Sequence, residues 1–225
     1  MLTRNLVIPE VPAQLGADWE RETARLGLAP GDVEALPFAR TRARWRDYST
    51  CVQALARWME SLGLADALAA GEVALMTCRG AKYHHDALQY GGTAFCNLFL
   101  SEDRALDLHF PRAGRRIPLH RGCAVIFDTA QAHAVVPRGT SIFRDADFPP
   151  GTDCAQVFLS WELPIEDGPL ARALGLEFDV DPAAASRLGE AQVWFDGVKA
   201  EVCPETGQWR AQPTAARGDC PMPAK

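Results

Sequence analysis

The first third of the chain carries hydrophobic residues at helical spacing. One stretch repeats them at steps of three and four, at Val52, Leu55, Met59 and Leu62. This spacing places the four side chains on one face and predicts a helix from Tyr48 to Leu64, with Gly63 as its end signal. Shorter amphipathic stretches predict further helices over residues 18–26 and 64–70.

From Val73 onward the pattern changes to short apolar runs separated by turn residues such as Gly91-Gly92 and Arg121-Gly122. The runs that we interpret as strands are Val73–Cys78, Thr93–Leu100, Ala105–Phe110, Arg116–Leu119, Ala124–Phe127, His133–Val136 and Gln156–Leu163. Seven short strands at this spacing favour an antiparallel sandwich or barrel over alternating βαβ units. Residues 179–190 predict a short helix, and residues 193–202 predict a hairpin around an Asp-Gly turn.

These elements predict one α+β domain, with helices first and a β core after them. A length of 225 residues suits a single domain with a substantial core. We place the domain at residues 1–211 and its β core at about 73–163. The tail over residues 212–225, rich in Pro, Gly, Ala and charged residues, is predicted to be disordered.

Composition excludes several classes of protein. No run of 18 apolar residues is present, so we expect no membrane span, and the N-terminus lacks the apolar core of a signal peptide. A formal net charge of −6 argues against nucleic acid as a partner. The seven cysteines form no CxxC pair, which argues against a zinc ribbon or a thioredoxin motif and favours the reducing cytoplasm.

The candidate chemistry lies in a window that contains all five histidines. His84 and Asp86 form a His-x-Asp pair, and alternation along a strand would point both to one face, with His85 on the other. His133 follows an apolar run and would start the next strand. Two imidazoles and one carboxylate on a metal leave about three positions open, as in non-haem Fe(II) oxygenases.

Three segments carry a family resemblance: His84-His85-Asp86, residues 121–128 (RGCAVIFD) and residues 133–139 (HAVVPRG). With them the chain resembles the 2-oxoglutarate/Fe(II)-dependent dioxygenases, over roughly residues 73–163. The resemblance implies a double-stranded β-helix (jelly-roll) core with N-terminal helices packed on one face. It also implies that His84, Asp86 and His133 bind Fe(II).

The same resemblance implies 2-oxoglutarate as cosubstrate, whose distal carboxylate calls for an arginine fork. Arg144 lies 11 residues after His133, a spacing similar to that of the phytanoyl-CoA hydroxylase-like branch. Arg138, five residues after that histidine, is the alternative. The sequence departs from the family pattern after Arg144, because residues 145–151 predict a loop where a strand is usual.

Other polar residues have less specific interpretations. Asn97 and Tyr90 are candidates for hydrogen bonds to the cosubstrate, whereas His109 is predicted to be an exposed strand residue. A group of arginines predicts either a solvated hairpin tip or an anion-binding lip: Arg112, Arg115, Arg116 and Arg121.

The sequence thus favours a cytoplasmic Fe(II)- and 2-oxoglutarate-dependent dioxygenase that uses dioxygen to hydroxylate a substrate. A small molecule or amino-acid derivative is favoured over a protein as that substrate. Two alternatives stay open: a cupin-type metalloenzyme that does not use 2-oxoglutarate, and a non-catalytic β-barrel for binding or assembly.

Overall fold

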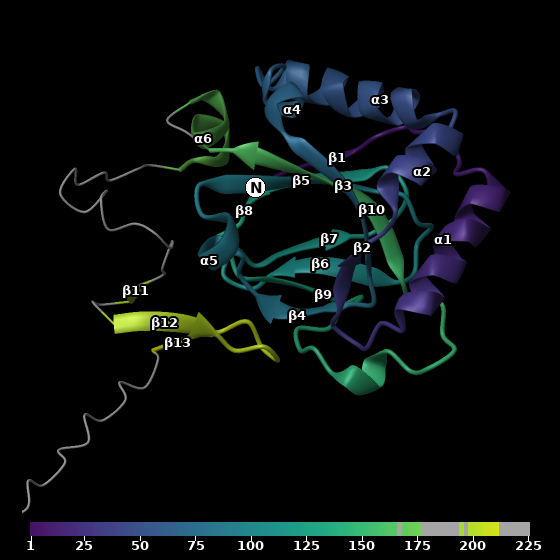
Figure 1. The fold of residues 1–225 in the computed structure, drawn as a ribbon. Helices are drawn as coiled ribbons and strands as arrows, with labels where there is room; N and C mark the ends of the chain where they lie inside the picture. The colour runs from purple at the N-terminus through teal and green to yellow at the C-terminus, as the bar shows by residue number, and fades with distance from the viewer. Residues whose placement is uncertain (166–167, 177–193, 196–197, 212–225) are drawn as a thin grey trace, which may run out of the picture.

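The computed structural model describes residues 1–165, 168–176, 194–195 and 198–211, and two antiparallel sheets dominate it (Figure 1). The larger sheet has the order β1-β8-β5-β10-β3-β2, and the smaller has the order β4-β9-β6-β7. The larger sheet consists of β1 (Leu2–Asn5), β2 (Val33–Ala35), β3 (Glu72–Cys78), β5 (Thr93–Phe99), β8 (Cys123–Asp128) and β10 (Gln156–Pro164). The smaller consists of β4 (Ala81–His84), β6 (Leu106–Phe110), β7 (Arg115–Pro118) and β9 (His133–Pro137).

The chain crosses between these two sheets in the manner of a double-stranded β-helix, so the predicted α+β jelly-roll core is confirmed. The N-terminal helices cover the outer face of the larger sheet, also as expected (Figure 1). They are α1 (Ala13–Leu26), α2 (Phe38–Arg44), α3 (Tyr48–Ser61) and α4 (Ala67–Ala70). In the described part of the chain, no helix is long and apolar enough to cross a membrane.

Three short elements complete the described chain. Helix α5 (Ala87–Tyr90) links the two sheets, a 3₁₀ turn (Asp145–Asp147) lies before β10, and α6 (Pro169–Leu174) follows β10. A small third sheet contains β11 (Trp194–Phe195), β12 (Val198–Val202) and β13 (Trp209–Ala211), in that order. The pairing of β11 with β12 confirms the predicted hairpin, although its turn at 196–197 lies outside the described residues.

Alternation along β10 shows how one strand serves two cores. Val157, Leu159 and Trp161 pack into the cluster under the helices, whereas Phe158 packs into the cluster between the two sheets. Side chains of β10 that share the face of Phe158 therefore point into the barrel.

Most predicted elements match the structure, and the differences have local causes. Helix α1 begins at Ala13, five residues before the predicted start, directly after Pro12 at its N-cap. Helices α2, α5 and α6, and strands β1, β2 and β13, were not predicted. The predicted helix at 179–190 and the tail at 212–225 lie outside the described residues.

Candidate metal centre

A β-bulge in β4 places His84 inside the barrel. Pairing with β9 matches Ala81 to Val135 and His84 to His133, so three steps along β4 span two steps along β9. The extra residue breaks the alternation, and His84 and His133 then share one face. Tyr83 lies on the other face, where its hydroxyl is 2.6 Å from Nδ1 of His109.

Asp86 reaches the same point from outside the strand. Strand β4 ends at His84, and Asp86 is the N-cap residue of α5. Its backbone N–H donates to the carbonyl of Thr129 (2.8 Å), which ties this turn to the end of β8. The expected strand alternation therefore does not explain why His84 and Asp86 meet; the strand-to-helix turn does.

The three side chains converge on one point. Nε2 of His84 lies 3.6 Å from Oδ1 of Asp86, and Nε2 of His133 lies 3.6 Å from Oδ2. The three potential ligand atoms all lie within 4.8 Å of one another. Small adjustments would allow all three to bind one ion at the usual distances of about 2.0–2.2 Å.

Backbone carbonyls orient both imidazoles. Nδ1 of His84 is 2.6 Å from the carbonyl of Lys82, and Nδ1 of His133 is 2.8 Å from the carbonyl of Gln131. Because a carbonyl can only accept, each Nδ1 carries a proton and donates it, which leaves Nε2 directed toward the shared point as the potential ligand atom. This is the orientation that a metal ligand needs.

Burial sets the charges of the group. It lowers the pKa of His133 to about 3, so this imidazole is neutral at ordinary pH. Burial also raises the pKa of Asp86, although the neighbouring histidines act in the opposite direction. The arrangement therefore holds a desolvated carboxylate beside the neutral His133 imidazole, and a bound cation would compensate the charge of that carboxylate.

The inner surface beside these ligands is largely aromatic. The ring of Phe127 lies 4.8 Å from that of His133, and the ring of Phe110 lies 5.9 Å from it. The inner face of the larger sheet adds one polar pair, Asn97 on β5 and its register partner Ser160 on β10. Asn97 is only 8% exposed, and its Oδ1 has no hydrogen-bond partner among the described residues.

Tyr90, the other candidate for a cosubstrate contact, ends α5. Its ring packs edge-on against Phe95 at 5.0 Å, and its hydroxyl accepts a hydrogen bond from Nε2 of Gln89 (3.1 Å). Tyr90 is thus close in the chain to Asp86 and packs beside the inner face of β5. Its contact with a cosubstrate stays a prediction.

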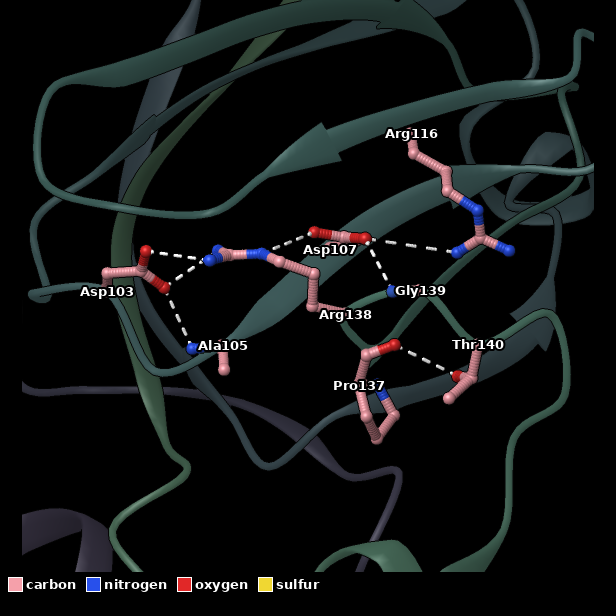
Figure 2. A network of polar contacts seen from close by, with 8 residues as sticks. All are labelled: Asp103, Ala105, Asp107, Arg116, Pro137, Arg138, Gly139 and Thr140. Atoms are coloured by element: carbon pink, nitrogen blue, oxygen red, sulfur yellow. Dashed lines mark hydrogen bonds and ion pairs between the residues drawn. The ribbon is translucent and has the colours of Figure 1, made fainter.

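Arg138 is engaged in a different network, shown in Figure 2. Its guanidinium donates to both carboxylate oxygens of Asp103, at 2.7 and 2.9 Å, and to Asp107 at 3.2 Å. Asp107 also accepts from the backbone N–H of Gly139. These contacts connect the turn after β9 to the start of β6. They also pair the Arg138 guanidinium with two carboxylates that are not among the candidate ligands.

Arg144 lies in the long loop between β9 and β10, directly before the 3₁₀ turn, and is exposed. No contact of its guanidinium is seen in the described part of the chain. Along β10, the face of Phe158 also carries Gln156, Ser160 and Glu162, so this strand provides no cation there. The assignment of Arg144 to the cosubstrate carboxylate stays a prediction.

Two arginines of the predicted group, Arg116 and Arg121, have separate partners. Arg116 donates to Oγ of Ser141 (2.5 Å) and lies near Asp107, whereas Arg121 pairs with Glu102 and Glu10. The expectation that His109 is exposed was wrong, because His109 is buried against Tyr83. The bulge that brings these two residues together leaves no signal in the sequence.

A C-terminal segment covers the outer side of β4. We call residues 203–209 the C-terminal clasp. The carbonyl of Pro204 accepts from the N–H of Tyr83 (2.9 Å), and Gly207 lies directly against the Tyr83 ring. Beyond it, the ring of Trp209 lies 5.0 Å from that of His85, the residue between two candidate ligands. Sequence patterns gave no indication of this contact.

No family model matches this chain, and no curated protein matches it. Among solved structures, it is similar to a viral collagen prolyl hydroxylase from Paramecium bursaria Chlorella virus-1 in complex with 2OG. That match has 11% identity and a TM-score of 0.35, and covers 71% of this chain and 95% of the other. The non-haem alpha-ketoglutarate-dependent epimerase SnoN from nogalamycin biosynthesis matches with 15% identity and a TM-score of 0.35, covering 83% and 90%.

The polyketide cyclase RemF from Streptomyces resistomycificus is a third similar structure, with 14% identity and a TM-score of 0.28. That match covers 48% of this chain and 74% of the cyclase chain. At these identities and scores the similarities assign neither an activity nor a substrate.

Proposed function

We propose that this protein is a mononuclear Fe(II)-dependent oxygenase that takes 2-oxoglutarate as cosubstrate and hydroxylates a small molecule. The observation that carries the proposal is the convergence of His84, Asp86 and His133 inside a double-stranded β-helix. Both imidazoles are already oriented by backbone carbonyls. Two neutral nitrogens and one carboxylate on one side of an ion form the facial set that suits ferrous iron.

Each ligand has a defined task. His84 and His133 would provide Nε2 lone pairs, and Asp86 would neutralise part of the cation's charge. Bound there, iron would supply the activation of dioxygen, for which side chains have no equivalent. Phe127 and Phe110 flank the buried histidine and keep water from that side of the site.

The inner face of the barrel supplies hydrogen bonds for the cosubstrate carboxylate, but β10 supplies no positive charge for it. The Asn97 amide and Ser160 hydroxyl lie side by side on the inner face and offer hydrogen bonds to a carboxylate. The charged partner would have to come from outside the inner face of β10, and Arg144 is the residue that the sequence spacing favours. We therefore assign Asn97 and Ser160 to the polar end of the cosubstrate and Arg144 to its charge.

A second candidate function follows from the same inner face. Because Gln156, Phe158 and Ser160 provide no cation there, the site also suits a cupin-type metalloenzyme that does not use 2-oxoglutarate. The two candidates share the metal ligands and differ in the cosubstrate. Titration of that cosubstrate therefore separates them.

The test is an anaerobic titration of the purified apo-protein. One equivalent of Fe(II) is added first, and 2-oxoglutarate is then added while visible absorption is recorded. Chelation of the keto acid to ferrous iron gives a weak metal-to-ligand charge-transfer band. We expect this band to saturate at one equivalent of 2-oxoglutarate, and to need a higher concentration in Arg144→Met than in the wild type.

Two histidine variants provide the matched control. His84→Ala should bind no stoichiometric iron and give no band, whereas His120→Ala should keep both, because His120 is not among the converging ligands. Iron binding without a band would favour the cupin-type enzyme. A protein that binds no stoichiometric iron would overturn both candidates and favour a non-catalytic barrel.

A further inference from the structure

A cavity lies away from the candidate metal centre. Its volume is about 720 Å³, and it is bounded by α1 on one side and by the ends of β5 and β10 on the other. Figure 1 shows α1 and α5 on opposite sides of the barrel, so this cavity and the metal ligands face different ends of the molecule. The volume falls within the range of about 300–1,000 Å³ that is usual for small-molecule sites.

The floor of the cavity is apolar. Trp19, Leu28, Leu100 and Val157 line it, and each of them is less than 9% exposed. Trp19 on α1, Leu100 directly after β5 and Val157 on β10 belong to the main core, and Leu28 lies in the loop after α1. A ligand with an apolar body could bury that body here without rearrangement of the fold.

Two arginines line the same cavity and keep unused donors. The Arg79 guanidinium donates to the carbonyls of Leu28, Phe148 and Pro149, and that of Arg104 pairs with Asp153. In both arginines the Nε atom is shielded from solvent. A ligand in the cavity would therefore meet the terminal nitrogens of the two guanidiniums, and Arg79 keeps one terminal N–H without an acceptor among the described residues.

The charges at the cavity separate into a deeper and an outer set. Glu102 and Glu10 are largely exposed and pair with Arg121, and Asp153 is exposed and pairs with Arg104. Glu20 on α1 also lines the cavity and is exposed. Arg79 instead meets only backbone carbonyls, so its positive charge has no carboxylate partner within the described chain. The half-buried guanidinium would therefore favour an anionic group beside it.

We propose that this cavity binds an amphipathic anion, with an apolar body on Trp19 and Leu28 and one oxyanion group at Arg79 and Arg104. Ser101 would assist, because its Oγ already accepts from the N–H of Val157 and its hydroxyl proton remains available. The site is separate from the metal ligands, and the proposal does not depend on the proposed oxygenase activity.

The test uses two fluorescent probes with a similar apolar body. The probe 1-anilinonaphthalene-8-sulfonate carries an oxyanion, and N-phenyl-1-naphthylamine lacks it. We expect the sulfonate to bind the full chain saturably at one site. Arg104→Met should weaken it about tenfold, the effect of losing one hydrogen bond to a charged group, while the neutral probe is unaffected.

Further variants locate the site. Ala24→Trp should fill the cavity from the exposed side of α1 and abolish binding of both probes, and Asp153→Asn should strengthen sulfonate binding by freeing Arg104. Arg25→Met, which changes an exposed arginine of the same helix outside the cavity, should have no effect. His84→Ala should also leave binding unchanged, so failure of the metal site is distinguishable from failure of this one.

Three results would overturn the proposal. One is the absence of saturable binding by a protein that unfolds cooperatively. Another is binding that persists in Ala24→Trp. The third is equal affinity for the two probes with no response to Arg104→Met or Asp153→Asn, because an apolar surface alone would then account for the signal.

Discussion

Tyr83 and His84 are neighbours in the chain, yet they serve opposite faces of the smaller sheet. His84 points inward with His133, and Tyr83 points outward to a buried hydrogen bond with His109. His84 therefore contributes to the candidate metal centre, and Tyr83 contributes to the packing on the opposite face of the sheet. The two contributions can be separated by substitution.

We expect Tyr83→Phe to lower the free energy of unfolding by about 1–3 kcal/mol, because Nδ1 of buried His109 loses its partner. Fe(II) binding should be retained, since the ring of the substituted residue still fills its place. Urea denaturation followed by tryptophan fluorescence measures the loss.

Tyr90→Phe is the control, because its hydroxyl contacts only the exposed side chain of Gln89 among the described residues. Its cost should stay within about 0.5 kcal/mol. Equal losses in the two variants would show that the buried hydrogen bond contributes nothing of its own.

Among the elements, the C-terminal clasp has the most direct link to the site. Its Pro204 and Glu205 carbonyls accept from the N–H groups of Tyr83 and Phe143, both at 2.9 Å. Trp209 then packs against His85, whose two neighbours are candidate ligands. The clasp thus holds the outer side of the turn whose inner side carries His84 and Asp86.

We expect Trp209→Ala to weaken Fe(II) affinity about tenfold, in the range known for groups that position metal ligands, with little change in overall stability. Anaerobic metal titration in competition with a chelator measures the affinity. Arg210→Ala, an exposed neighbour on the same strand, should leave it unchanged. An unaltered Fe(II) affinity in Trp209→Ala would show that the clasp covers the sheet but does not position the metal ligands.

The strands of the barrel were predictable because their apolar runs are bounded by turn residues, as in 93–100 and 124–127. Strand β1 was not predictable, because Thr3, Arg4 and Asn5 are exposed and only the hydrogen bonds of this segment to β8 make it a strand. The three converging side chains of the candidate metal centre could be selected from spacing and order. The network of Arg138 could not, because Asp103 and Asp107 lie more than 30 positions away in the chain.

At the scale of the whole molecule, buried histidines make stability depend on pH. Burial lowers the pKa of His133 to about 3 and also lowers that of His109. An unfolded histidine titrates near about 6.5, so between these values the unfolded chain binds more protons than the folded one. Stability from this source is therefore present above about pH 6.5 and is lost as the pH falls toward 3.

We expect the metal-free protein to lose on the order of 3 kcal/mol from His133 between about pH 7 and pH 4. Urea denaturation at several pH values measures this slope. A His133→Gln variant, which cannot gain a proton, should show a shallower slope over the same window. An identical slope in both proteins would assign the acid sensitivity to other groups.

The position of the clasp in the chain also sets when the candidate metal centre becomes covered during synthesis. Translation delivers His84, Asp86 and His133 well before Pro204 and Trp209, and domains begin to fold while they are being made. The ligands can thus converge on a nascent chain whose β4 is still uncovered on its outer side. A metal ion that bound these three side chains on the ribosome would meet a less covered site than an ion that bound after release.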